Sequence, residues 1–243
     1  GCKFQDLNYE KQLEFKIQVV RDNLSRIGGV ELPEKIEAFA ADKQYQYRNK
    51  ASFAVQGKTS DPQIGFYSEG SHKVADSPTC DILPEPINNA KEWLREILKK
   101  NQISVYNEGN HRGLVRGLVI RHSESTGEVL VGMMTNEGRF PRNFLTELTE
   151  EKKLKELGIV GIIQNINPRA TNVILGKENR LLWGKERLTD KLADLSFHLS
   201  LGSFFQIHSA QTLRLYDLIY NWVDAAEEKT IIDAYSGSGG IAL

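Results

Sequence analysis

The segment near the C-terminal end restricts the fold more than any other part of the sequence. An apolar run at residues 229–233 predicts a short strand that ends at Asp233, and the glycine-rich run GSGG at residues 237–240 follows it. Glycine lets the backbone approach a ligand closely, and the helix N-terminus that normally follows such a turn binds anionic groups. A parallel strand also needs a crossover before its neighbour can form. The segment therefore predicts the start of an α/β unit with a cofactor site, and we expect the chain to be cut short at Leu243.

More than one class of cofactor fits this glycine turn. Gly237, Gly239 and Ala242 satisfy the loose dinucleotide fingerprint G-x-G-x-x-G/A, which is typical of nicotinamide or flavin enzymes. A dinucleotide-binding domain usually places this fingerprint on its first strand, whereas here a helix predicted around residues 213–223 precedes the strand. A different cofactor and a purely structural turn both stay open.

The rest of the chain predicts helices mixed with short strands. Apolar residues at three- and four-residue steps predict helices at residues 9–27 and 88–100, and Gly28 and Gly29 end the first one. Alternating apolar residues bounded by turn signals predict strands. These strands fall within residues 44–83 and at residues 113–122, 128–135, 159–164, 172–175, 180–183 and 195–199. The strands at 113–122 and 128–135 are expected to form a hairpin. Residues 40–200 are therefore expected to be α+β and rich in antiparallel pairs.

The overall charge gives no sign of a polyanionic partner, because 31 basic and 32 acidic side chains leave a formal net charge of −1. Any nucleic-acid site must be a local patch. Basic residues gather at residues 48–58 and 111–122, and tyrosines and phenylalanines interleave near the first run. Such a surface suits RNA, since guanidinium groups hold phosphates and rings stack on unpaired bases. The alternative is an ordinary solvated strand face over an aromatic core.

Cysteine and histidine usage restricts the remaining chemistry. Cys2 and Cys80 are too few for a disulfide framework, so they are either unrelated free thiols or metal ligands. The five histidines show neither metal spacing nor a Ser-His-Asp pattern. No apolar run is long enough for a membrane span, and the first residues lack the layout of a secretory signal. We therefore expect a cytoplasmic protein with no membrane partner.

Several short segments, in order along essentially the whole chain, carry a more specific signal than any single motif. They are Gly1-Cys2 with Gln5, Leu7, Tyr9, Gln12, Leu13 and Lys16; YRNKASF at 47–53; IGFYSEGSHKV at 64–74; Cys80-Asp81-Ile82-Leu83; Gln164-Asn165-Ile166-Asn167; Thr171-Asn172; SFFQ at 203–206; and DAYSGSGG at 233–240. In this combination the chain resembles the RNA uracil-5-methyltransferases, and within them the iron–sulfur branch that acts on large-subunit ribosomal RNA.

The resemblance implies an N-terminal oligonucleotide-binding-like domain, a central RNA-contacting domain with a [4Fe-4S] cluster, and a C-terminal methyltransferase domain. Residues 1–40 would be a cluster-motif remnant with a helix that packs against the methyltransferase domain. Residues 41–200 would be the α+β central domain of antiparallel strands with helices, and residues 201–243 the beginning of the α/β, Rossmann-like methyltransferase domain. Cys2 and Cys80 match the third and fourth cluster cysteines. Because such a cluster takes four thiolates, we expect it in a longer parent protein and not in this chain.

The resemblance also implies a cofactor, S-adenosylmethionine, and the residues that bind it. Gln206 and Tyr235 match positions that contact this cofactor. The loop that contains Gly237, Gly239 and Gly240 lies where the cofactor would pass.

Three further residues are implied in RNA contacts. Phe204 matches a residue near the flipped uracil, and Arg48 and Lys50 fall in a segment that resembles RNA-contacting residues. The chain departs from the pattern at two positions, since the family usually has Asn in place of His208 and often Cys in place of Ser236.

The implied reaction is the methylation of carbon 5 of uridine in ribosomal RNA. A cysteine thiolate adds to carbon 6, carbon 5 takes the methyl group, and a base removes the carbon 5 proton before the thiolate leaves. The target base must first leave its stack. The nucleophile and the base are expected beyond Leu243, so we expect this chain, a monomer, to be inactive alone. The alternatives are a dinucleotide-dependent oxidoreductase and a non-enzymatic RNA-binding module.

Overall fold

The computed structural model describes residues 3–169, 174–224, 230 and 232–241, so Cys2 and Thr171-Asn172 lie outside the described residues. The chain divides into two compact units, Gly1–Gln44 and Tyr45–Leu243. Within the described ranges, none of the helices combines the length and the apolar character needed to cross a membrane.

The first unit is built around one helix. α1 (Tyr9–Asp22) begins at Asn8, whose side-chain oxygen accepts a hydrogen bond from the Lys11 amide at 2.9 Å, and a π-helical turn (Asn23–Ile27) extends it. Gly29 follows with a φ of 63°. The helix predicted at residues 9–27 is confirmed. No residue of α1 is buried, so its apolar stripe does not fill a core, and its packing against a methyltransferase domain stays a prediction.

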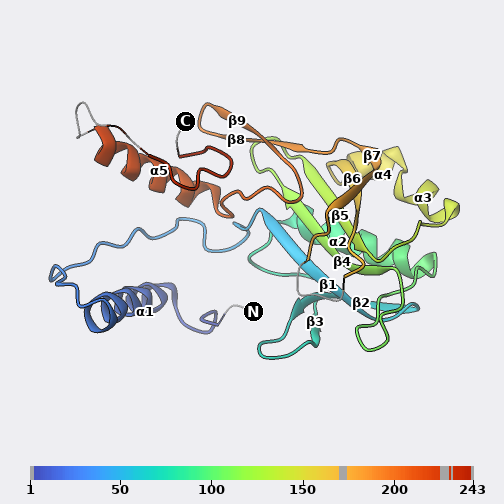
Figure 1. Cartoon of the computed structure of the whole chain (residues 1–243), viewed down its shortest axis with the longest axis horizontal. Coiled ribbons are helices and arrows are strands. Elements are labelled where there is room, and N and C mark those ends of the chain that lie inside the picture. The colour runs from blue at the N-terminus through green and yellow to red at the C-terminus, as the bar shows by residue number, and fades with distance from the viewer. Residues whose placement is uncertain (1–2, 170–173, 225–229, 231, 242–243) are drawn as a thin grey trace. The chain divides into compact units, whose positions relative to one another are not determined.

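The second unit is built on a seven-stranded mixed sheet with the order β3-β2-β1-β4-β5-β6-β7, while β8 and β9 form a separate hairpin (Figure 1). The strands are β1 (Lys50–Lys58), β2 (Asp61–Tyr67), β3 (Val74–Asp76), β4 (Val115–His122), β5 (Val129–Thr135), β6 (Ile159–Ile166), β7 (Glu178–Gly184), β8 (Leu188–Leu192) and β9 (Leu195–Leu199). Neighbouring strands in the sheet run antiparallel except β5 and β6, which are parallel. The chain is therefore a mixed α/β protein.

The sequence patterns do not predict the parallel pair of β5 and β6. Two short helices, α3 (Arg142–Leu148) and α4 (Glu151–Glu156), lie in the connection between these strands and supply the crossover that a parallel pair requires. Neither helix is long enough to show clear helical periodicity, and β8 is similarly short. The predicted hairpin of β4 and β5 and the predicted strands β6, β7 and β9 are confirmed.

Each face of the sheet carries a core. α2 (Glu85–Lys100), α3 and α4 pack on one face, and β8, β9 and the segment that follows them pack on the other (Figure 1). In β4, Leu118 and Ile120 point into the first core and Val119 points into the second. The central strands β4 and β5 are thus buried on both faces, which explains their nearly continuous apolar sequences.

Two predicted strands are not observed. Residues 172–173 lie outside the described residues, and residues 174–175 belong to no strand. In the C-terminal run, residues 229 and 231 are likewise outside, and residues 230, 232 and 233 are not in a strand. Ile232 is 82% exposed. A strand needs a neighbour, and among the described residues none pairs with either segment.

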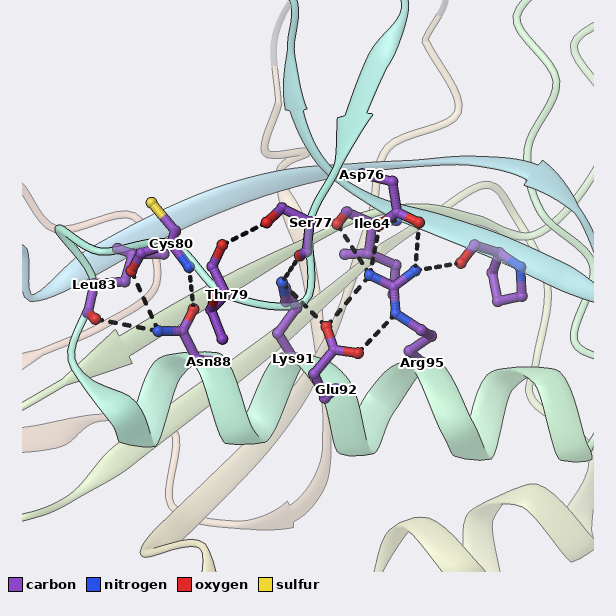
Figure 2. A network of polar contacts seen from close by, with 11 residues as sticks. Ile64, Asp76, Ser77, Thr79, Cys80, Leu83, Asn88, Lys91, Glu92 and Arg95 are labelled. Atoms are coloured by element: carbon purple, nitrogen blue, oxygen red, sulfur yellow. Dashed lines mark hydrogen bonds and ion pairs between the residues drawn. The ribbon is translucent and has the colours of Figure 1, made fainter. Parts of the chain in front are cut away.

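Side chains of α2 fix the loop between β3 and α2 (Figure 2). Asn88 accepts a hydrogen bond from the Cys80 amide at 3.1 Å and donates to the carbonyls of Cys80 and Leu83 at 3.3 and 3.2 Å. The buried Lys91 ammonium donates to the carbonyl of Ser77. Because the polar groups of the loop are satisfied by one helix, the loop has a defined shape.

Arg95 ties the same helix to the edge of the sheet. Its guanidinium contacts both carboxylate oxygens of Asp76, at 2.6 and 3.0 Å, and the carbonyls of Pro62 and Ile64 at 2.8 and 3.3 Å (Figure 2). Glu92 holds the guanidinium from the helix at 3.0 Å. α2, β2 and β3 are therefore joined by charge-assisted hydrogen bonds.

Replacing Asn88 with alanine is expected to lower the free energy of unfolding by about 1–3 kcal/mol, because an amide and two carbonyls would lose their partner in a buried place. Asn89, its exposed neighbour on α2, is the matched control, and Asn89→Ala should change the free energy by less than about 0.5 kcal/mol. Urea unfolding followed by tryptophan fluorescence measures both variants. Equal effects of the two substitutions would show that Asn88 does not anchor the loop.

Candidate functional site

Asn49 joins the segment before β1 to the segment after β9. Its backbone N–H donates to the Ile207 carbonyl at 3.0 Å, and its side-chain Nδ2 donates to the Gln206 carbonyl at 2.9 Å. The ring of Tyr47 stacks on that of His208, with centroids 4.6 Å apart and 16° between the ring planes. These contacts place the predicted RNA-contacting residues of one segment beside the predicted uracil- and cofactor-contacting residues of the other.

The loop held by α2 also supports the first segment. The backbone N–H of Gln46 donates to the Asp81 carbonyl at 2.8 Å, and that of Arg48 donates to the Ile82 carbonyl at 3.0 Å. The side-chain Nε of Arg48 donates to the carbonyl of Lys50 at 3.0 Å. α2 therefore positions the basic segment through this loop.

Lys50 and Arg121 form a pair of positive charges that is only partly compensated. They lie opposite each other in the register of β1 and β4, and Arg121 is 2% exposed. Arg121 donates to the carbonyl of Ser203, and its buried Nε has no partner among the described residues. Burial lowers the pKa of Arg121 to about 10, against the opposing charge of Asp190. Burial, followed by the charges of Arg121 and Arg48, lowers the pKa of Lys50 to about 8. A bound phosphate would relieve this repulsion.

Phe204 and Phe205 have opposite environments. Phe204 is 72% exposed, whereas Phe205 is buried in the second core, where its ring centroid lies 5.1 Å from that of Phe197. The buried ring anchors the segment, and the exposed ring is available for stacking on an unpaired base next to the positive charges. The geometry suits the role predicted for Phe204, which stays a prediction.

The glycine turn packs against α5 (Ser209–Asp224). Gly240 is buried, and a Cβ at this position would lie 2.7 Å from the hydroxyl of Tyr216. Tyr216 packs against the second core, and burial together with the negative charge of Asp233 raises its pKa. Gly237 and Gly239 have φ values of 56° and 78°, which larger side chains rarely adopt. The turn therefore needs its glycines, and α5 connects it to the core that anchors residues 203–206.

Tyr235 does not line a pocket in this structure, because 99% of the residue is exposed. Gln206, which is predicted to contact the same cofactor, is half-buried and accepts the hydrogen bond from Asn49. Ala242, the last residue of the dinucleotide fingerprint, lies outside the described residues. The cofactor contacts assigned to Gln206 and Tyr235 stay predictions.

The cysteines do not fit an iron–sulfur cluster in this chain. Cys80 is half-buried in the loop held by Asn88, and the chain has only one other cysteine, Cys2. A [4Fe-4S] cluster takes four thiolates. Among the residues that the structure describes, no group of three or more His, Cys, Asp or Glu side chains could hold a metal ion.

The sequence alone does not single out Asn49 or Arg121. Arg121 belongs to a basic run on an alternating strand, but its burial follows from the pairing register and from the segment after β9 that it contacts, which no local pattern encodes. Asn49 is part of the YRNKASF motif, so that motif was the signal that could have found it.

Replacing Asn49 with alanine removes its side-chain link and leaves its backbone hydrogen bonds in place. We expect a loss of about 1–2 kcal/mol in the free energy of unfolding and faster amide hydrogen exchange in residues 203–207 than in the rest of the second unit. Hydrogen-exchange mass spectrometry measures this, with Asn143→Ala at an exposed position as the control. Unchanged exchange in residues 203–207 would contradict the role given to Asn49.

The chain is similar along its whole length to proteins named uncharacterized RNA methyltransferases. It is 35% identical over 245 residues to one from Clostridium tetani, 36% identical over 245 residues to one from Listeria monocytogenes, and 39% identical over 239 residues to one from Lactobacillus johnsonii. These alignments cover 98–100% of this chain and 52–53% of the relatives. The chain thus spans about half the length of the curated relatives it matches, and no family model matches it.

A solved structure is also similar to this chain. It is the crystal structure of the Pyrococcus abyssi tRNA (uracil-54, C5)-methyltransferase in complex with S-adenosyl-L-homocysteine, with a TM-score of 0.76 and 30% sequence identity. The superposition covers 100% of this chain and 54% of that protein. In sequence and in fold, the chain is therefore similar to about half of an RNA methyltransferase.

Proposed function

We propose that the chain is part of an enzyme that methylates carbon 5 of uridine in ribosomal RNA with S-adenosylmethionine. Residues 41–200 are the central RNA-contacting domain, residues 201–243 begin the methyltransferase domain, and residues 1–40 carry the cluster-motif remnant and a helix that packs against that domain. The observation that carries the proposal is the junction at Asn49, which holds a basic segment beside an exposed aromatic ring. The similarity to RNA methyltransferases supports the same assignment.

RNA binding in this proposal uses the positive charges at the junction. Lys50 and Arg48 contact phosphates, and Arg121 adds to the positive potential from below the surface. Phe204 is the exposed ring on which a base can stack once the target uracil has left its helix.

Cofactor binding is assigned to the second segment and to the glycine turn. Gln206, Tyr235 and the glycines at positions 237, 239 and 240 hold S-adenosylmethionine, which supplies an electrophilic methyl group when bound. The turn fits this task because glycine has no Cβ and leaves the backbone accessible, and Gly237 lies exposed at its surface.

The proposed reaction follows from the weak nucleophilicity of carbon 5 of uracil. Addition of a thiolate to carbon 6 makes carbon 5 enolate-like, so that it takes the methyl group. A base then removes the carbon 5 proton and the thiolate leaves. Neither Cys2 nor Cys80 is assigned the role of nucleophile, so we propose that these 243 residues alone do not catalyse methylation.

The cofactor assignment can be tested on the complete protein that contains this chain. Gln206→Ala and Tyr235→Ala are each expected to weaken the binding of S-adenosyl-L-homocysteine about tenfold, the loss of roughly 1.4 kcal/mol. Isothermal titration calorimetry measures this, and Tyr220→Ala, which changes an exposed tyrosine on α5, serves as the control. Tight binding of a nicotinamide or flavin dinucleotide without affinity for S-adenosyl-L-homocysteine would favour an oxidoreductase instead.

Lys50 is expected to lower the stability of the protein at neutral pH. Its pKa of about 8 in the folded state lies below the ordinary value of 10.5. The charged form therefore opposes folding at pH 7, and stability rises between pH 8 and 10.5 because only the unfolded chain keeps the proton. Lys50→Gln should raise the Tm at pH 7 by a few degrees. The variant should also lack the increase in stability between pH 8 and 10.5. Calorimetry across this pH range tests the claim, with Lys58→Gln at the exposed end of β1 as the control.

The same lysine should make RNA binding depend on pH. A phosphate favours the charged amine, so the affinity of the complete protein for a ribosomal RNA fragment should fall several-fold between pH 7.5 and 9, as free Lys50 loses its proton. Lys50→Arg keeps its charge and should show no such fall in RNA affinity.

Replacing Arg48 and Lys50 with alanine should also flatten the salt dependence of RNA binding, by about 0.7–0.9 in the logarithmic slope for each lost contact. Fluorescence anisotropy measures both effects, and unchanged slopes would remove these residues from the RNA surface.

A further inference from the structure

A cavity of about 380 Å³ extends along the same strand as the candidate site. Ser52, Ala54 and Gln56 line it, and these residues share one face of β1 with Lys50 because side chains alternate along a strand. Ser52 follows Lys50 by about 7 Å. The small side chains of Ser52 and Ala54 leave the cavity open above the sheet. The cavity therefore continues the surface on which Lys50 lies.

One part of the lining presents a carboxylate that neighbouring side chains contact. The hydroxyl of Tyr67 donates to one oxygen of Glu108 at 3.0 Å, and Nδ1 of His72 lies 3.3 Å from the other. Burial and then the hydrogen bond to Glu108 raise the pKa of Tyr67 to about 12, so the phenol keeps its proton. The rings of Tyr67 and His72 meet edge to face, 5.7 Å apart. The carboxylate is thus oriented by the Tyr67 hydroxyl, lies beside the His72 ring and still has free acceptor positions.

Another part of the lining carries a cation that the chain's own contacts hold in place. The guanidinium of Arg116 lies over the ring of Tyr106, 4.5 Å from its centroid, and donates to the carbonyls of Asn167 and Arg169. The hydroxyl of Tyr106 hydrogen-bonds to Nδ1 of His111 at 2.7 Å. Because these contacts fix both side chains before any ligand binds, little ordering is needed when one does.

We propose that this cavity binds one unstacked base of the RNA substrate, and that the base is guanine. This inference rests on the proposed function and names a second RNA contact beside the methylation site. The base stacks against Tyr67, which is partly exposed, and its hydrogen-bonding edge meets Glu108. The volume suits a single base, since ligand cavities of 300 Å³ or more are typical for small molecules.

The chemistry of Glu108 selects among the bases. A carboxylate only accepts hydrogen bonds, and guanine presents two adjacent donors on its pairing edge. Adenine and cytosine each present an amino group next to an acceptor nitrogen, which repels the second oxygen. Uracil offers a single N–H between two carbonyls. The cavity therefore disfavours uracil, which separates it from the site that holds the target base.

The test measures the binding of labelled RNA pentamers by the complete protein. Fluorescence anisotropy compares UUGUU with UUUUU, UUAUU and UUCUU at fixed salt. Wild type is expected to bind UUGUU at least fivefold more tightly than UUUUU. Glu108→Gln, which has the same size but also offers a donor, should lose most of this preference. Tyr67→Ala should weaken binding of UUGUU about tenfold through loss of stacking, whereas Tyr67→Phe keeps the ring and should lose less. Tyr220→Ala is the control for removal of an exposed tyrosine.

The outcomes separate this inference from the proposed function. Equal binding of the four pentamers by wild type, or unchanged binding by Glu108→Gln and Tyr67→Ala, would overturn the guanine cavity. If Lys50→Gln still weakens all pentamers in that case, the RNA surface stands without the cavity. If the wild-type protein does not bind S-adenosyl-L-homocysteine, that result counts against the proposed function, and the pentamer result can still be interpreted.

Discussion

Asn49 makes hydrogen bonds to the consecutive carbonyls of Gln206 and Ile207. Gln206 lies 157 positions after Asn49 in the chain. Its own segment carries Arg48 and Lys50, and the later segment carries Phe204. The ring stacking of Tyr47 on His208 joins the same two segments. The basic surface and the exposed aromatic ring can act on one RNA molecule only while this junction holds, because a flexible connection would leave their spacing undefined.

The junction is supported from behind by α2. Asn88 fixes the loop that precedes the helix. The carbonyls of Asp81 and Ile82 in that loop accept hydrogen bonds from the backbone amides of Gln46 and Arg48. The surface that results is not optimal for stability, since Lys50 faces a buried arginine. Such partly compensated charge costs folding free energy and is retained most readily where a ligand neutralises it. The physical cost at Lys50 and the RNA contact proposed for it are thus two consequences of one arrangement.

Local patterns in the sequence predicted much of the fold. The long helices α1, α2 and α5 and the strands with clear alternation were predicted because their periodicity is visible within one element. The helices α3 and α4, the strand β8 and the parallel pairing of β5 with β6 were not, because short elements show too little periodicity and strand order is a long-range property. The same holds for the site. Arg48, Lys50 and Phe204 were predicted from motifs, but the burial of Arg121 depends on how β1 pairs with β4 and on what covers that face. The roles of Tyr235 and the glycine turn as cofactor contacts stay predictions.

The assignment as a uracil-5 methyltransferase can be tested in one reaction. Large-subunit ribosomal RNA carrying tritium at carbon 5 of its uridines is incubated with the complete protein and S-adenosylmethionine, and tritium released to water is counted. Methylation at carbon 5 must replace this hydrogen, so we predict release that depends on S-adenosylmethionine and matches the methyl groups transferred. Transfer of methyl groups without release of tritium, or no transfer by a folded protein that binds this RNA, would contradict the assignment.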